Sequence, residues 1–137
     1  MMFAPSGSTK GGGVGFVLEG TVSNVARGND FAQVIVKGKL RLIEYPNGKP
    51  PASIIEFICP EGMAATLIEW RAFYAMSADW RGGALRQPGN LFEILAAAEK
   101  RGNVVKFELV SPRIDFAGGS CPAVTSEVIR ATDVDLR

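Results

Sequence analysis

Hydrophobic and polar residues alternate most regularly over residues 31–45 (FAQVIVKGKLRLIEY), with the period of two that a half-buried β-strand requires. The apolar positions are Ala32, Val34, Val36, Leu40 and Leu42. The polar positions are Gln33, Lys37, Lys39, Arg41 and Tyr45. Gly38 interrupts the middle of this strand, where a bulge or a barrel corner is expected.

Four other segments have the composition of strands. Residues 14–25 (VGFVLEGTVSNV) are rich in β-branched and aromatic side chains and precede a Gly/Asn/Asp turn cluster. Residues 53–59 (SIIEFIC) form a short apolar run bounded by turn residues. Residues 104–110 (VVKFELV) alternate, and residues 123–134 (AVTSEVIRATDV) provide a last strand. These patterns predict a three-stranded meander followed by two or more strands.

The period changes after Pro60 and Gly62. An apolar stripe at the positions i, i+4, i+7 and i+11 predicts a helix, and its members are Met63, Leu67, Trp70 and Tyr74. Trp70, Phe73 and Tyr74 are expected in the core or in a subunit contact.

A second helix is predicted over residues 91–101. Asn90 is placed as the N-cap, Glu93 as its capping-box partner and Gly102 just past the C-terminus. Residues 77–90 contain three Gly and one Pro, which predicts a long loop between the helices.

This order of elements differs from the alternating strand-helix pattern of a parallel sheet. It predicts a mainly β fold with α, a five-stranded OB-like Greek-key barrel with one or two helices between strands 3 and 4. Residues 1–13 are expected to be a flexible N-terminal tail and residues 14–137 a single domain.

Composition excludes most catalytic chemistry. The chain has no histidine, which excludes Ser-His and Cys-His pairs and His-ligated metals. Its two cysteines, Cys59 and Cys121, stand outside any CxxC pattern and are too few for a usual zinc site. We therefore expect no enzyme, no catalytic residue, no cofactor and no metal. Neither a signal peptide nor a spanning apolar run is present, so we expect a cytoplasmic protein that does not contact membrane.

The net charge of +1 hides a local excess of positive charge. Between residues 27 and 49 five basic residues stand against two acids, and the basic ones are Arg27, Lys37, Lys39, Arg41 and Lys49. Basic side chains beside an aromatic ring such as Tyr45 are typical of surfaces that bind single strands by phosphate neutralisation and base stacking. The alternative is the solvated outer face that any half-buried strand carries.

The loop over residues 77–90 offers a second candidate contact. Trp80 lies there with Arg81 and Arg86, between glycines. A base could stack on Trp80, or this ring could instead anchor the loop to the barrel.

The whole pattern resembles the OB-fold single-stranded DNA-binding proteins of bacteria, phages and mobile elements. The resemblance lies in the Gly-rich start, the first strand GFVLEGTVSNV, the long basic-faced second strand, and AAAEKRGNVVKFELV as helix, turn and fourth strand. The insert around Trp80 and the final Val134-Asp135-Leu136-Arg137, in place of an acidic tail, depart from the bacterial pattern.

This resemblance implies sequence-tolerant binding of single-stranded DNA, or of RNA, by a homo-oligomer in replication, recombination or transfer of DNA. A structural or protein-interaction module, such as a virion or secretion-machine component, is the alternative. That module would have no nucleic-acid activity.

Overall fold

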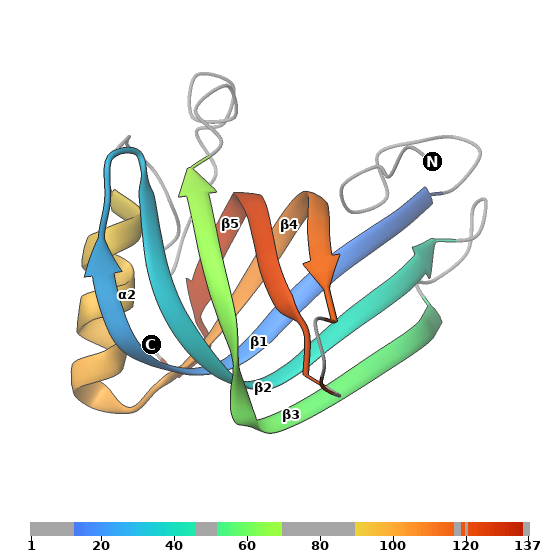
Figure 1. Ribbon diagram of the computed structural model, residues 1–137, viewed down its shortest axis with the longest axis horizontal. Helices are drawn as coiled ribbons and strands as arrows, with labels where there is room; N and C mark the ends of the chain where they lie inside the picture. Colours follow the sequence, from blue (N-terminus) through green and yellow to red (C-terminus); the bar gives the residue numbers. More distant parts are fainter. Residues whose placement is uncertain (1–12, 46–51, 70–89, 117–118, 120, 136–137) are drawn as a thin grey trace.

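The computed structural model describes residues 13–45, 52–69, 90–116, 119 and 121–135. They form the strands β1 (Gly13–Arg27), β2 (Phe31–Tyr45), β3 (Ala52–Glu69), β4 (Val104–Asp115) and β5 (Ala123–Asp133) and the helix α2 (Asn90–Arg101) (Figure 1). The prediction of a mainly β protein is confirmed. Residues 1–12 of the predicted tail lie outside the described residues.

The five strands form one closed sheet in the order β1-β2-β3-β5-β4, with β4 returning to β1. Neighbouring strands are antiparallel except β3 and β5, which run parallel. The helix α2 follows β3 and precedes β4 along the chain. In Figure 1 the long strands β1, β2 and β3 curve together, and β4 and β5 lie across their concave side.

The alternation predicted for β2 is confirmed. Ala32, Val34, Val36 and Leu40 are buried inside the barrel, whereas Gln33 and Lys37 are exposed. Burial of one face of a strand is the main source of its stability, because each fully buried Val or Leu contributes about 1.5–3 kcal/mol.

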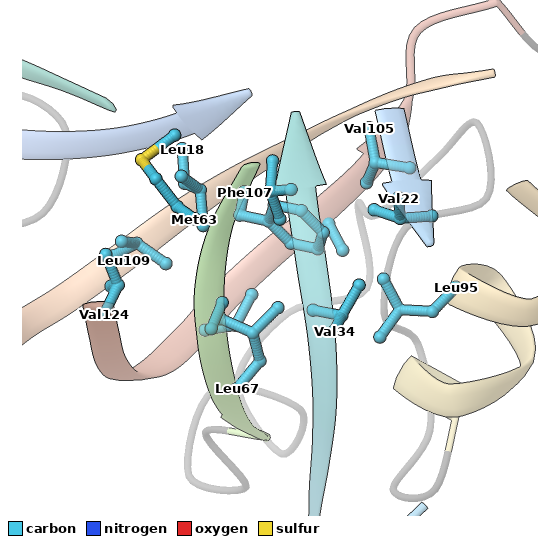
Figure 2. Close-up of a cluster of buried hydrophobic side chains, with 14 of the residues drawn as sticks. Leu18, Val22, Val34, Met63, Leu67, Leu95, Val105, Phe107, Leu109 and Val124 are labelled. Atoms are coloured by element: carbon cyan, nitrogen blue, oxygen red, sulfur yellow. The ribbon is translucent and has the colours of Figure 1, made fainter. Parts of the chain in front are cut away.

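The core combines side chains from all five strands with one face of α2 (Figure 2). Phe107 of β4 and Leu18 of β1 are fully buried in its centre. Leu91, Leu95 and Ala98 recur at helical spacing on α2 and are also buried. Figure 2 shows Leu95 pointing toward Val34, so the helix covers one end of the core.

Local signals explain where α2 ends. Gly102 has a φ of 69°, a conformation that glycine adopts without strain. The amide of Gly102 donates to the carbonyl oxygen of Glu99 (3.3 Å), and that of Asn103 donates to the carbonyl oxygen of Ala98 (3.0 Å). This is a Schellman motif, and the predicted C-terminus of the helix is confirmed.

The predicted helix beginning near Met63 is wrong over the described residues, because β3 continues to Glu69. Met63, Ala65 and Leu67 are buried while Ala64 is exposed, which is the period of two. A spacing of four, as between Met63 and Leu67, places side chains on one face of either a helix or a strand. Trp70 and Tyr74, also assigned to that helix, lie outside the described residues.

A bulge explains why β3 passes through residues that normally end a strand. Val36 pairs with Met63 and Gly38 with Cys59, so residues 60–62 of β3 face the single residue Lys37 of β2. Proline is tolerated in a bulge because no ladder hydrogen bond is required there, and Gly62 adopts a φ of 113°. The sequence predicts that this strand ends at residue 59, but residue 59 only precedes the bulge and β3 continues to Glu69.

Two glycines allow β1 and β2 to approach each other closely. Gly20 and Gly38 are direct partners in the register. A Cβ atom on Gly20 would collide with the carbonyl oxygen of Lys37, and one on Gly38 would collide with the carbonyl oxygen of Glu19. The barrel corner expected at Gly38 therefore depends on the absence of side chains at both positions.

Candidate nucleic-acid interface

The outer face of β2 carries the cations that the sequence singled out. Lys37, Lys39 and Arg41 alternate with the inward-facing residues, so they occupy one face of the strand. Thr21 of β1 is the partner of Lys37, and Ile58 of β3 is a partner of Lys39. The structure thus brings these three cations together along the middle of the three-stranded outer surface.

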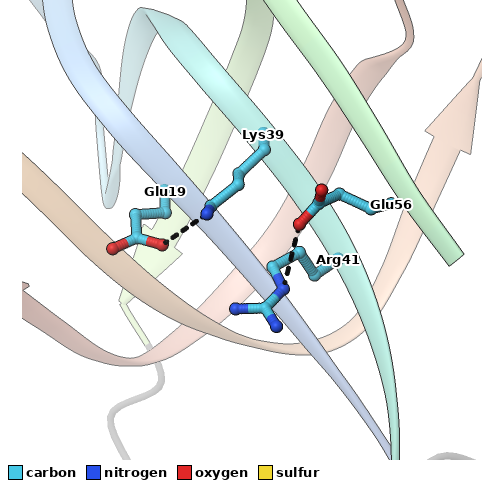
Figure 3. A network of polar contacts seen from close by, with 4 residues as sticks. All are labelled: Glu19, Lys39, Arg41 and Glu56. Atoms are coloured by element: carbon cyan, nitrogen blue, oxygen red, sulfur yellow. Dashed lines mark ion pairs between the residues drawn. The ribbon is translucent and has the colours of Figure 1, made fainter. Parts of the chain in front are cut away.

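Two of the three cations are paired with carboxylates on the neighbouring strands (Figure 3). Lys39 Nζ lies 3.9 Å from Glu19 Oε1, and Arg41 Nε lies 3.3 Å from Glu56 Oε2. Each pair joins residues directly opposite in the register. The side chains of Lys39 and Arg41 are 39% and 34% exposed. Ion pairs this exposed contribute about 0–1 kcal/mol, so they leave the cations available to a competing anion.

An open hollow of about 640 Å³ lies on this surface beside Lys37 and Lys39. Its apolar lining includes Ile58 and Pro60 of β3. Ile58 is 69% exposed, although exposure of an isoleucine side chain to water is energetically unfavourable. The carboxylates of Glu19 and Glu56 line the hollow as well. A ligand with anionic and flat apolar parts would therefore have to replace these carboxylates beside the cations.

Arg27, another predicted contact, lies apart from this hollow. It stands six residues beyond Thr21 on β1 and contacts α2. Its guanidinium lies 5.2 Å from the centroid of the Phe92 ring, and its Nη1 lies 3.7 Å from Glu93 Oε1. Arg27 thus joins β1 to the helix, and the structure does not bring it together with Lys37 and Lys39.

The side chains of the remaining predicted contacts lie outside what the structure describes. Lys49, Trp80, Arg81 and Arg86 lie outside the described residues. The backbone of Tyr45 ends β2 and pairs with Gly13, but its side chain lies outside what the structure describes.

The acidic partners were not foreseen from the sequence. Glu19 and Glu56 stand at polar positions of strands that the sequence did predict. Their pairing with Lys39 and Arg41 depends on the register between strands, which no local pattern specifies. The sequence likewise identifies Ile58 only as part of the apolar run over residues 53–59 and does not indicate that its side chain is exposed.

The described residues contain neither a group of metal ligands nor a membrane-spanning helix. In that part of the chain, no three His, Cys, Asp or Glu side chains are grouped so that they could hold a metal ion. The one helix found there is too short and too polar to cross a membrane.

Comparison with known proteins identified no matching protein family, no similar curated protein and no similar solved structure.

Proposed function

We propose that this protein binds single-stranded DNA without reading its sequence, through the outer face of β1, β2 and β3. It acts as a binding protein and not as an enzyme, in replication, recombination or transfer of DNA. Lys37, Lys39 and Arg41 contact phosphates, while Ile58 contacts the bases or sugars.

The topology supports this proposal. A closed sheet in the order β1-β2-β3-β5-β4, with β3 and β5 parallel and the helix before β4, is compatible with the OB-like fold that we propose. OB-folds bind oligonucleotides on the face of strands 2 and 3. The cations and the hollow lie on this face. Fold alone does not establish function, so the proposal depends on the chemistry of the face.

The chemistry fits a single strand better than a duplex. A single strand offers phosphates and unstacked bases together, so it needs cations next to apolar surface. The hollow places Lys37 and Lys39 beside Ile58 and Pro60. This juxtaposition is the observation that carries the proposal.

The ion pairs are compatible with phosphate binding. The carboxylates of Glu19 and Glu56 hold Lys39 and Arg41 over the surface, and a phosphate oxygen then replaces the carboxylate. Lys37 is exposed, and no ion pair joins it to another described residue. Lys37 therefore provides the first contact and the paired cations follow.

Charge reversal with a matched control tests the proposal. We expect Lys37→Glu to weaken binding of a labelled oligo-dT about tenfold at low salt and to reduce the salt slope by about 0.7, as expected for one lost phosphate contact. Lys100→Glu, on the exposed face of α2, changes the net charge equally. Equal losses in both variants, measured by fluorescence anisotropy, would contradict a localised site.

A protein-interaction role is the second candidate, and the 69% exposed side chain of Ile58 on the outer face favours it. A protein partner would contact this side chain and depend little on the neighbouring cations. Under this alternative, reversing Lys37 and Lys39 leaves partner binding intact. Under the proposed function the same reversal abolishes binding of DNA.

A further inference from the structure

The two cysteines lie in different parts of the chain but contact the same core. Cys59 is fully buried in β3, on the inner face opposite Gly38. Cys121 lies in the connection between β4 and β5, two residues before Ala123, and is partly buried against the core cluster that contains Cys59. Both thiols are free.

Two separate contacts hold this connection against β3. The thiols of Cys59 and Cys121 lie close enough for Cys121 to raise the pKa of Cys59, and Cys121 packs against the core cluster that contains Cys59. Phe57 precedes Cys59 by two residues and so shares its face of β3. The Phe57 ring lies 5.1 Å, between centroids, from that of Phe116, which belongs to the same connection as Cys121. Two adjacent pairs of side chains, Cys59 with Cys121 and Phe57 with Phe116, thus hold the β4–β5 connection against β3.

The environments of the two thiols differ. Burial, followed by the neighbouring thiol of Cys121, raises the pKa of Cys59 to about 11. The Cys59 side chain is fully buried, so reagents in solution do not reach it while the protein is folded. Cys121 is the more accessible of the two, so an oxidant in solution reaches it first.

We propose that Cys59 and Cys121 form a reversible disulfide that ties the β4–β5 connection to β3 when the protein meets a peroxide. Hydrogen peroxide transfers one oxygen to the thiol of Cys121, which gives a sulfenic acid and one water. The sulfur of Cys59 then attacks the sulfur of Cys121, the S–O bond breaks, and the thiol proton leaves with the hydroxyl as a second water. A dithiol reduces the bond and restores both thiols.

The cross-link closes a long loop, from residue 59 to residue 121, and so restricts the unfolded chain. We expect a melting temperature roughly 5–10 °C higher in the oxidised protein. Lys39 and Ile58 lie on the opposite face of the sheet from Cys59, so oxidation leaves the proposed DNA-binding surface unchanged. The proposal is thus independent of the proposed function.

The full-length wild-type protein provides the test. It is treated with hydrogen peroxide and then unfolded in denaturant, remaining thiols are blocked with iodoacetamide, and its mass is measured without reduction. We expect a monomer that has lost two hydrogens and takes up no iodoacetamide. Peptide mapping should then place the cross-link between Cys59 and Cys121. Dithiothreitol should restore both thiols and the lower melting temperature.

Cys121→Ser is the matched variant, because it removes the thiol with only a small change in side-chain volume and no change in charge. After the same treatment this variant should keep Cys59 as a reduced thiol and show no rise in melting temperature. The proposal is overturned if wild-type protein keeps two free thiols, if oxygen adds to Cys121 without a cross-link, or if the disulfide joins two molecules instead.

Discussion

The two faces of β2 show how differently one strand is constrained on its two sides. On the inner face Val36 and Leu40 are 0% and 1% exposed, packed against side chains from the rest of the barrel. On the outer face Lys39 and Arg41 keep more than a third of their side-chain surface exposed and each meets a carboxylate. Substitutions on the inner face should therefore change stability, and those on the outer face should change binding.

The largest effect is expected at Gly38, the barrel corner in the middle of β2. Gly38→Val should lower the free energy of unfolding by about 4 kcal/mol or more, because its Cβ would occupy the position of the Glu19 carbonyl oxygen. Urea denaturation followed by circular dichroism measures this loss. Gly102→Ala is the control. No atom lies within 4 Å of the Cβ it adds, so only its backbone conformation costs free energy, about 1 kcal/mol. Equal losses would show that crowding at the corner is unimportant.

The inner face itself comes next. Leu40→Ala should cost about 3 kcal/mol, since it removes a fully buried side chain and leaves a cavity. The same denaturation experiment measures it, with Ile58→Ala on the outer face of β3 as the control. Ile58 is 69% exposed, so its truncation should change stability by less than about 1 kcal/mol. Similar values for both variants would remove the distinction between the faces.

A buried polar contact should have an intermediate effect. The side-chain amide of Asn103 donates to both carboxylate oxygens of Asp133, at 3.1 and 3.0 Å, and Asp133 is only 4% exposed. Asp133→Ala should cost about 1–3 kcal/mol because the amide of Asn103 loses its partner. Thermal unfolding with the double variant Asp133→Ala/Asn103→Ala completes the cycle. Additive losses in this cycle would show that the two side chains are not coupled.

The smallest stability change is expected on the outer face. Glu56→Gln should change the free energy of unfolding by no more than about 1 kcal/mol, because the side chains of Arg41 and Glu56 are 34% and 36% exposed. The same variant should tighten binding of oligo-dT a few-fold, since it removes a competing carboxylate. Anisotropy and thermal unfolding on one preparation separate the two effects. Unchanged or weaker binding would show that Arg41 does not contact phosphate.

The sequence predicts elements whose signals are local. All of β2 follows from its alternation, and the end of α2 follows from Gly102, because both signals act over a few residues. The second half of β3 was missed because the spacing of Met63 and Leu67 fits a helix as well as a strand. From the sequence alone, Pro60 and Gly62 also indicate the end of a strand, whereas in the structure they lie in a bulge of β3.

The candidate site was predictable only in part for a related reason. The cations of β2 follow from alternation, which assigns Lys37, Lys39 and Arg41 to one face. Their carboxylate partners do not, because Glu19 and Glu56 reach that face through the pairing of three strands. Arg27 belonged to the same basic stretch of sequence but contacts α2, a tertiary contact that composition does not reveal.

The central claim is that the outer face of the sheet binds single-stranded DNA, and titration of the wild-type protein into fluorescently labelled oligo-dT tests it most directly. Anisotropy is measured at two salt concentrations. We predict binding at micromolar protein or below in low salt. The logarithm of the binding constant should fall with the logarithm of salt with a slope of about −2, as three phosphate contacts on a single strand require. Absence of binding at micromolar protein in low salt would contradict the account.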